Sequence, residues 1–345
     1  KLMAGYIGKS QGVTQVDGYT RSETDVLLDA INVYDAATDS TGFFALPSGT
    51  TAQRPVSPAE GYLRYNTTEG YTEEYRNGSW RALSDVFVAT GGTETTITDG
   101  GINYKVHTFT SSGTFTVTSG TGSVEYLVIA GGGSGGSANN SFAEGGGGGA
   151  GGYRCSVSGE SSGGGASAES ALTLSAGDYA VTVGAGGAQV TSGEDVPGNQ
   201  GSDSTFATIT ALGGGRGGGN STNNATDGGS GGGGMESDGA GGSGTTGQGY
   251  DGGNGTEAGD HGGGGGGAGA AGTVDNGGTG VTSAINGTSV CRAGGGSGNQ
   301  SGTATCGGGT VSTNGANNTG GGGGSGSTSN PGAGGSGIVI VRYAI

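Results

Sequence analysis

The chain has 345 residues, of which 92 are glycine, and only 30% are hydrophobic, 6% aromatic and 12% charged. This composition excludes a conventional apolar core along the whole chain, so apolar burial must be concentrated in particular segments. The formal net charge of −16 argues against a nucleic-acid binder, which needs a basic surface, and no apolar run approaches the ~20 residues that cross a membrane.

Residues 1–44 contain one short helix pattern. Residues 20–23 (TRSE) have the spacing of a capping box, and Leu27, Leu28 and Ile31 then fall on one face at helical spacing. A single helix of fewer than ~12–15 residues is marginal in isolation. We therefore expect identical chains to bring these apolar stripes together around an axis as a stalk. The alternative is a lone amphipathic helix docked on its own chain.

Residues 45–84 predict a small β-meander. The stretches 63–66, 71–76 and 79–81 have strand character, and Asn77-Gly78 is a strong hairpin turn. Aromatic side chains are expected to supply most of the apolar surface, namely Tyr65, Tyr71, Tyr75 and Trp80. So small a module is expected to pack on its copies. The alternative role for these rings is a sugar-binding platform.

Residues 85–345 are the third predicted domain, which is mainly β. A hairpin is expected at 104–110 and 114–118, followed by a strand at 124–130 (VEYLVIA). Further strands are expected at 153–158, 170–174, 179–183, 204–212 and 338–343. Because both faces of 124–130 and 338–341 are apolar, these two are expected to be central strands. About eight strands make a small β-sandwich, which would form the base of the domain.

Most of the glycines lie in runs between residues 131 and 336, and an apolar strand pattern brackets that field at each end. Glycine loses more conformational entropy on ordering than any other residue, so such runs are typical of flexible linkers. Collagen is excluded, because the runs lack a strict three-residue period. The remaining option is a bundle of polyproline-II-type helices, whose backbone groups point outward and can pair with neighbours. We expect this ordered bundle, because a linker has no reason to be held at both ends by strands.

Few residues offer chemistry. His107 and His261 have no nucleophile or metal-ligand spacing around them, so no catalytic residue, metal site or cofactor is predicted. Residues 252–260 approach the calcium-binding nonapeptide repeat, but the unit occurs once and a calcium β-roll needs stacked repeats.

Three cysteines are present, and an odd count rules out a full disulfide framework within one chain. Cys291 and Cys306 either pair across a loop or remain two buried thiols, and Cys155 is left over.

Several stretches resemble bacteriophage proteins. LPSGTTAQRPVSPAEGYLRYNTTEGYTEEYRNGSW (46–80) looks like the recurring module of tail fibres and tail spikes, and DGYTRSETDVLLDAI (17–31) is similar to their helical stalk segments. The region from VEYLVIAGGGSGG through LSAGDYAVTVGAGG to GGSGIVIVRY resembles the glycine-rich domain of phage fibre tips. The tip adhesins of T-even-like phages are a more distant likeness, because this chain carries stalk and module as well. In those adhesins, polyglycine-II helices form a bundle whose distal loops contact the host receptor.

This resemblance implies a non-enzymatic fibre tip of the virion, a homotrimer located outside the cell. Its expected partners are an outer-membrane protein or glycan of the host bacterium and the proximal tail-fibre or baseplate proteins. It implies neither nucleic-acid binding nor membrane insertion. The alternative is a structural subunit of an extracellular filament whose copies stack through the glycine-rich domain.

The candidate receptor-binding residues are polar side chains between the glycine runs, and the longest loops are expected at 235–261 and 273–292. The candidates are Asn223, Asn224, Tyr250, Asp251, Asn254, His261, Asn276, Asn286, Asn317 and Asn318. The alternative is that these residues are solvated turns, as Asn and Asp usually are between regular segments.

Overall fold

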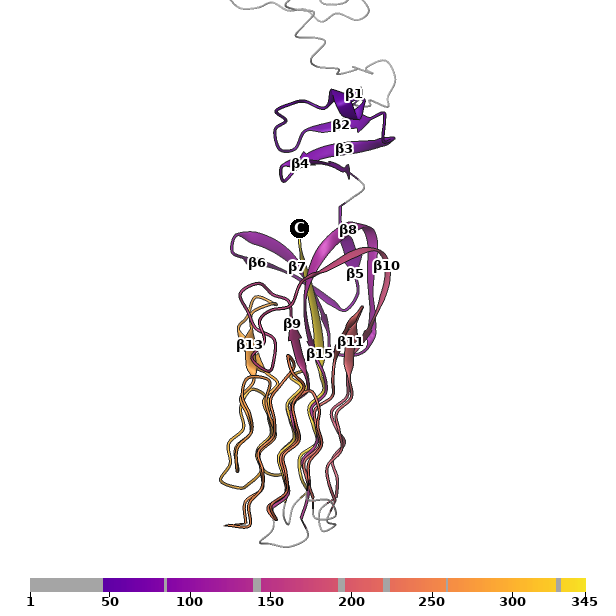
Figure 1. The fold of residues 1–345 in the computed structure, drawn as a ribbon. Helices are drawn as coiled ribbons and strands as arrows, with labels where there is room; N and C mark the ends of the chain where they lie inside the picture. Colours follow the sequence, from indigo (N-terminus) through magenta and orange to yellow (C-terminus); the bar gives the residue numbers. More distant parts are fainter. Residues whose placement is uncertain are drawn as a thin grey trace, which may run out of the picture. The chain divides into compact units, whose positions relative to one another are not determined.

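The computed structural model describes residues 46–83, 86–138, 144–191, 196–219, 224–258, 260–326 and 330–345. The expected stalk helix at residues 20–31 lies outside these ranges. The chain divides into two compact units, Lys1–Val86 and Phe87–Ile345. The described residues form fifteen strands and one 3-10 turn, which confirms the predicted mainly β class (Figure 1). Within those ranges, no helix has the length and apolar character needed to cross a membrane.

The described part of the first unit is a four-stranded sheet in the order β1-β2-β3-β4. Its elements are β1 (Ser48–Gly49), the 3-10 turn η1 (Thr51–Gln53), β2 (Leu63–Asn66), β3 (Tyr71–Arg76) and β4 (Ser79–Ala82). The predicted meander is confirmed in β2, β3 and β4. Asn77 and Gly78 have φ angles of 52° and 74°, as the tight hairpin between β3 and β4 requires.

The interior face of this first unit combines buried polar side chains with three of the four predicted aromatic rings, because Tyr71, Tyr75 and Trp80 are half-buried on the same face as Glu73. Arg64, Asn66 and Glu73 are buried, whereas Tyr65 is 41% exposed. Arg64 and Asn66 alternate with Tyr65 along β2, so they lie on the opposite face of the sheet from Tyr65. Trp80 lies near these polar side chains, because the Arg64 guanidinium is 5.9 Å from the centre of its ring.

The second unit contains most of the strands. They are β5 (Val88–Thr90), β6 (Thr93–Asp99), β7 (Ile102–Phe109), β8 (Gly113–Ile129), β9 (Tyr153–Cys155), β10 (Leu172–Thr182), β11 (Ser204–Phe206), β12 (Ile209–Ala211), β13 (Val281–Ser283), β14 (Val290–Arg292) and β15 (Ile338–Ala344). The main sheet follows the order β12-β11-β10-β8-β15-β7-β6, and β5 and β9 also pair with β8. β13 and β14 form a separate two-stranded sheet.

The last strand, β15, lies between β7 and β8 and pairs antiparallel with both. The predicted hairpin of 104–110 with 114–118 is therefore wrong, although both stretches are strands. β15 is apolar on both faces, so burial between two neighbours stabilises it more than an edge position would. The prediction that 124–130 and 338–341 are central strands is confirmed.

Both faces of the main sheet are covered by apolar side chains. Alternate residues of β8 belong to two separate clusters, one containing Val124, Tyr126 and Val128 and the other containing Leu127 and Ile129. β15 is divided in the same way between the two clusters. Burial on both faces explains why residues 126–129 of β8 and 338–341 of β15 show no polar alternation.

Glycine-rich segments extend from the strands and are hydrogen-bonded to one another (Figure 1). Along each segment, N–H groups three residues apart donate to the same neighbouring segment. In residues 131–137, Gly131, Ser134 and Ser137 donate to the carbonyls of Ser202, Asn199 and Val196, Gly132 and Gly135 donate to Gly335 and Gly332, and Gly133 and Gly136 donate to Gly149 and Gly146. One extended segment therefore contacts three others through its N–H groups alone.

Residues 144–152 form the most enclosed of these segments. Its N–H groups donate in rotation to residues 212–218, 263–266 and 320–326, and its carbonyls accept from residues 133–136, 230–233 and 296. Six other segments therefore surround it. A Cβ added at Gly148 would overlap the carbonyl oxygen of Gly133, so glycine is required for this close approach.

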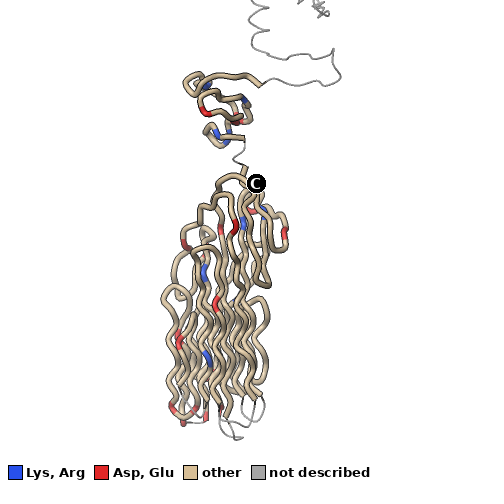
Figure 2. The backbone as a smooth tube through the Cα atoms, turned by 90° about the vertical axis from the view of Figure 1, so that its right-hand side faces the viewer, with Lys and Arg blue, Asp and Glu red and all other residues tan. Residues whose placement is uncertain are grey.

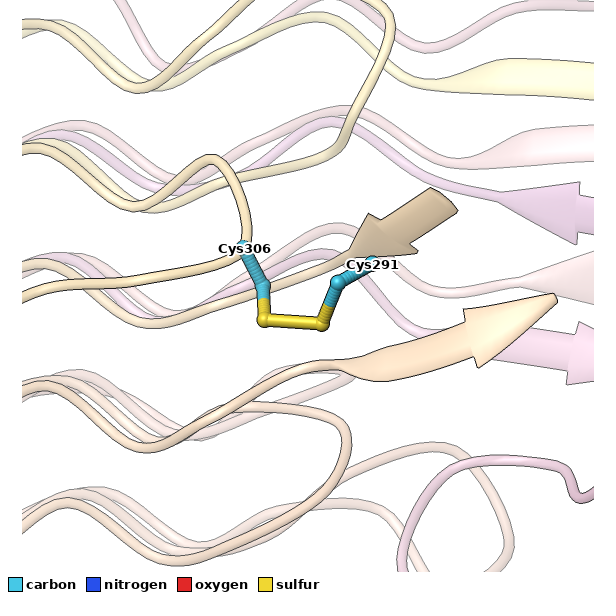
Figure 3. Close-up of a disulfide and its surroundings, with 2 residues drawn as sticks. All are labelled: Cys291 and Cys306. Carbon is cyan, nitrogen blue, oxygen red and sulfur yellow. A yellow bond between two sulfur atoms is a disulfide. The ribbon is translucent and has the colours of Figure 1, made fainter. Parts of the chain in front are cut away.

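A disulfide joins Cys291 of β14 to Cys306, which follows the next glycine-rich segment (Figure 3). The two sulfur atoms are 2.05 Å apart and the two Cα atoms 4.8 Å apart. This resolves the alternative of two buried thiols. Cys155 is the free cysteine of the described residues, and it is buried.

Loss of this disulfide should lower the free energy of unfolding of the second unit. For the observed separation of 15 residues, the entropy of the closed loop predicts a loss of about 3 kcal/mol. Urea denaturation of a Cys291→Ser, Cys306→Ser double variant measures this loss. A reductant should destabilise the wild-type protein and leave the double variant unchanged. Equal stability of the two oxidised proteins would contradict the prediction.

Candidate binding surface

The glycine-rich segments run side by side between the strands and the opposite end of the second unit, which we call the distal end (Figure 1). The predicted loop 235–261 is not one loop. It begins and ends with a short turn at the distal end, and between these turns two extended segments, 240–244 and 250–255, are joined by a third turn at residues 245–249. The predicted loop 273–292 likewise contains β13 and β14. These stretches are long because they cross the unit, so their polar residues do not form one surface.

Four Asn and Asp side chains hold the outer segment 240–244 in place. They lie on its two sides in pairs three residues apart, and each accepts a hydrogen bond from a backbone N–H of the segment. The bonds are Ala240 N to Asn224 Oδ1 at 3.0 Å, Ser243 N to Asp227 Oδ1 at 2.6 Å, Gly241 N to Asn254 Oδ1 at 2.9 Å and Gly244 N to Asp251 Oδ1 at 2.8 Å. The side chains of three candidate residues, Asn224, Asp251 and Asn254, therefore accept hydrogen bonds that a backbone carbonyl accepts elsewhere in the glycine-rich segments.

Four other candidates lie near the strands instead of the distal end. Tyr250 follows Gln248, whose carbonyl accepts from the first residue of β9, and Asn286 lies in the turn between β13 and β14. Asn318 donates its N–H to Ser336 Oγ, two residues before β15, and Asn317 precedes it. Asn223 lies outside the described residues.

The two remaining candidates, His261 and Asn276, lie at the distal end. His261 Nδ1 is 2.7 Å from Asp275 Oδ1 and 3.0 Å from Asn299 Nδ2. Asn276 Oδ1 accepts from both the N–H and the hydroxyl of Thr303, each at 2.9 Å. Three turns of the chain are thereby joined through side chains.

Carboxylates are also gathered at the distal end, whereas few charges lie along the glycine-rich segments (Figure 2). Glu144 is only 7% exposed, and its Oε2 has no hydrogen-bond partner among the described residues. Its backbone N–H donates to Glu236 Oε2 at 2.8 Å. Burial, followed by the charges of Glu236 and Asp275, raises the pKa of Glu144 to about 7. Below that pH, Glu144 therefore keeps its proton in the folded protein.

Glu144→Gln should stabilise the protein near pH 8 and leave it unchanged near pH 4. The pKa of Glu144 is raised in the folded state, so the unfolded chain loses this proton first as pH rises and the folded state is penalised between about pH 4.3 and 7. The difference should reach up to about 3 kcal/mol above that range. Thermal melts of both proteins across this range measure it. The exposed distal Glu257→Gln is the matched control, and an equal gain from it would contradict the prediction.

We call Glu144, Glu236, His261, Asp275, Asn276 and Asn299 the distal group. The sequence-based candidates included His261 and Asn276 but missed Glu144, Glu236, Asp275 and Asn299. These residues lie on turns that are neighbours in space. Which turns are neighbours depends on how the glycine-rich segments pair, and that pairing is known only from the structure. Among the described residues, no group of three or more His, Cys, Asp or Glu side chains is placed to hold a metal ion.

Comparison with known proteins gives one clear result. A model of the family described as "Glycine-rich domain" matches residues 108–344, which is most of the chain. A search of curated proteins found no match. The matched region begins at the end of β7 and covers the strands from β8 onward and all of the glycine-rich segments. The chain therefore belongs to the glycine-rich domain family.

Proposed function

We propose that this protein is the receptor-binding tip of a bacteriophage tail fibre, a homotrimer that contacts the host-cell surface through its distal end. In this proposal the curled sheet is a sandwich-like base, and the glycine-rich segments are polyglycine-II helices packed as a bundle. The observation that supports the bundle most strongly is the three-residue repeat of the hydrogen bonds, since a polyproline-II-type helix has three residues per turn.

A bundle of this kind suits a receptor-binding role for a physical reason. Ordering a side chain during binding costs roughly 0.5–1.5 kcal/mol, so a scaffold that is already rigid retains more of the contact energy. Within the distal group, His261, Asp275 and Asn299 are already joined by short contacts before any receptor arrives. The likeness of residues 46–80 to tail-fibre modules supports the same role.

The proposal is tested by binding fluorescently labelled protein to a panel of bacterial strains, measured by flow cytometry. On a strain that binds, a distal Glu236→Ser, His261→Ser variant should bind at least about tenfold more weakly, a loss of ~1.4 kcal/mol. The matched Asn286→Ser, Asn317→Ser variant at the strand end should bind normally. Normal binding by the distal variant would contradict the distal site.

The trimer is tested separately. Light scattering on the intact protein should give a molecular mass of three times 32.4 kDa, and a continuous filament would favour the structural alternative.

A further inference from the structure

An open groove runs along the side of the glycine-rich segments. Three segments line it, residues 241–243, 251–255 and 272–274, and its volume is about 440 Å³. Glycine supplies most of the lining, and Thr273 and Val274 are exposed residues on one wall. The groove is therefore bounded chiefly by backbone.

The middle segment of the groove has one unpaired set of amides. Its N–H groups follow the three-residue repeat, because Tyr250 and Gly253 donate to Gly267 and Gly264, and Gly252 and Gly255 donate to Gly242 and Gly239. The third set consists of Asp251 and Asn254, whose N–H groups have no acceptor among the described residues. In the enclosed segment, by contrast, every N–H from Gly146 to Gly152 donates.

The two walls of the groove add further unpaired groups. Within the described residues, the carbonyl of Gly241 accepts no hydrogen bond and the N–H of Val274 donates none. The side chains of Asp251 and Asn254 do not fill the groove, because they are held to Gly244 N and Gly241 N on one wall. The groove therefore has unpaired backbone donors and an acceptor along it. In the interior of the bundle, the corresponding groups are hydrogen-bonded to a neighbouring segment.

We propose that this groove binds an extended glycine-rich segment of another polypeptide, laid against the bundle as one more member. The unpaired N–H groups of Asp251 and Asn254 are one three-residue repeat apart, about 9 Å along a polyproline-II-type chain, so successive carbonyls of such a chain meet both. Glycine is needed in the ligand because packed segments lie too close together for a side chain: a Cβ at Gly241 would overlap the carbonyl oxygen of Gly252, and one at Gly253 that of Thr273.

Peptide chemistry fits the groove better than glycan chemistry does. The unpaired groups recur at a peptide repeat and come from backbone. Asp251 is the one charged residue of the lining, which favours a ligand with a flanking lysine. This inference goes beyond receptor binding at the distal end and does not depend on it.

The test uses the intact isotope-labelled protein and a soluble peptide with six glycines between two lysines. Amide NMR signals of Asp251, Asn254 and Val274 should shift and saturate on titration, and those of Asn286 and Thr288 should not. A matched peptide with valine at every third position should cause no shift. If the glycine peptide shifts no groove amide, or shifts amides throughout the protein alike, the inference is overturned.

A groove-filling variant checks the location. Val274→Trp should weaken peptide binding at least tenfold, and Thr288→Trp in the β13–β14 turn should leave it unchanged. If Val274→Trp melts at a lower temperature, the wild-type titration alone decides. An oligosaccharide such as maltohexaose is the competing probe, and shifts of the groove amides by it but not by the peptide would show that the groove is a glycan site.

Discussion

Gly265→Val should prevent the glycine-rich part of the second unit from folding. Gly265 donates its N–H to Gly296 and accepts from Gly278, so its segment cannot move away from its neighbours without losing both bonds. A Cβ at this position would overlap the carbonyl oxygen of Gly148 in the enclosed segment. We expect a loss of more than about 4 kcal/mol, which is exceptional for one substitution. Urea denaturation monitored by circular dichroism measures it.

The matched control is Ala240→Val, an equally conservative change at an exposed position of an outer segment. It should change the free energy of unfolding by less than about 0.5 kcal/mol. If Gly265→Val were as stable as this control, close contact between backbones would not be what organises the segments.

Glu73→Ala should unfold the first unit and leave the second intact. Glu73 is fully buried, and its Oε2 lies 2.6 Å from Arg54 Nη2 and 2.9 Å from Asn66 Nδ2. Arg64 Nε is 3.6 Å from Oε1. Removal of the carboxylate leaves the buried Arg64 and the half-buried Arg54 without their counter-charge, a loss of about 3–5 kcal/mol. Fluorescence of Trp80, the single tryptophan of the chain, measures this unit alone.

The same group should make the first unit sensitive to acid. Burial raises the pKa of Glu73, but hydrogen bonds from Arg54 and Asn66 outweigh it, so the pKa is lowered overall. Its stabilisation is therefore present above the unfolded pKa of about 4.3 and is lost as pH falls through the lower folded value. Glu74→Ala removes the same charge from the opposite face of β3 and is the control. Equal effects of the two substitutions would contradict the buried network.

Strands β2, β3 and β4 of the first unit could be predicted from sequence, but its buried polar groups could not. Asn77-Gly78 fixes the hairpin and therefore the register of β3 and β4. Alternation then indicates which residues share a face, but not which face the preceding segment covers. That segment supplies Arg54 to Glu73, so the interior face contains a buried carboxylate and its partners beside the aromatic rings.

In the second unit, local pattern identified most of the strands but missed β5, β6, β13 and β14, and it also missed the place of β15 between β7 and β8. The apolar character of β15 predicted a central strand, yet nothing local indicated that it would separate β7 from β8. The distal group has the same origin, since Glu144 and Glu236 are brought together only by the pairing of distant segments. Candidate residues chosen for polarity alone, such as Asn254 and Asp251, instead hold a neighbouring segment.

Amide hydrogen exchange resolved by residue tests most directly whether the glycine-rich segments are an ordered, mutually bonded structure. Every N–H from Gly263 to Ala268 donates to another backbone carbonyl, so these amides should exchange slowly. Asp251 and Asn254, whose N–H groups have no partner in the described part of the chain, should exchange fast within the same region. Fast exchange throughout residues 263–268 would show that these segments behave as a flexible linker and would contradict the account.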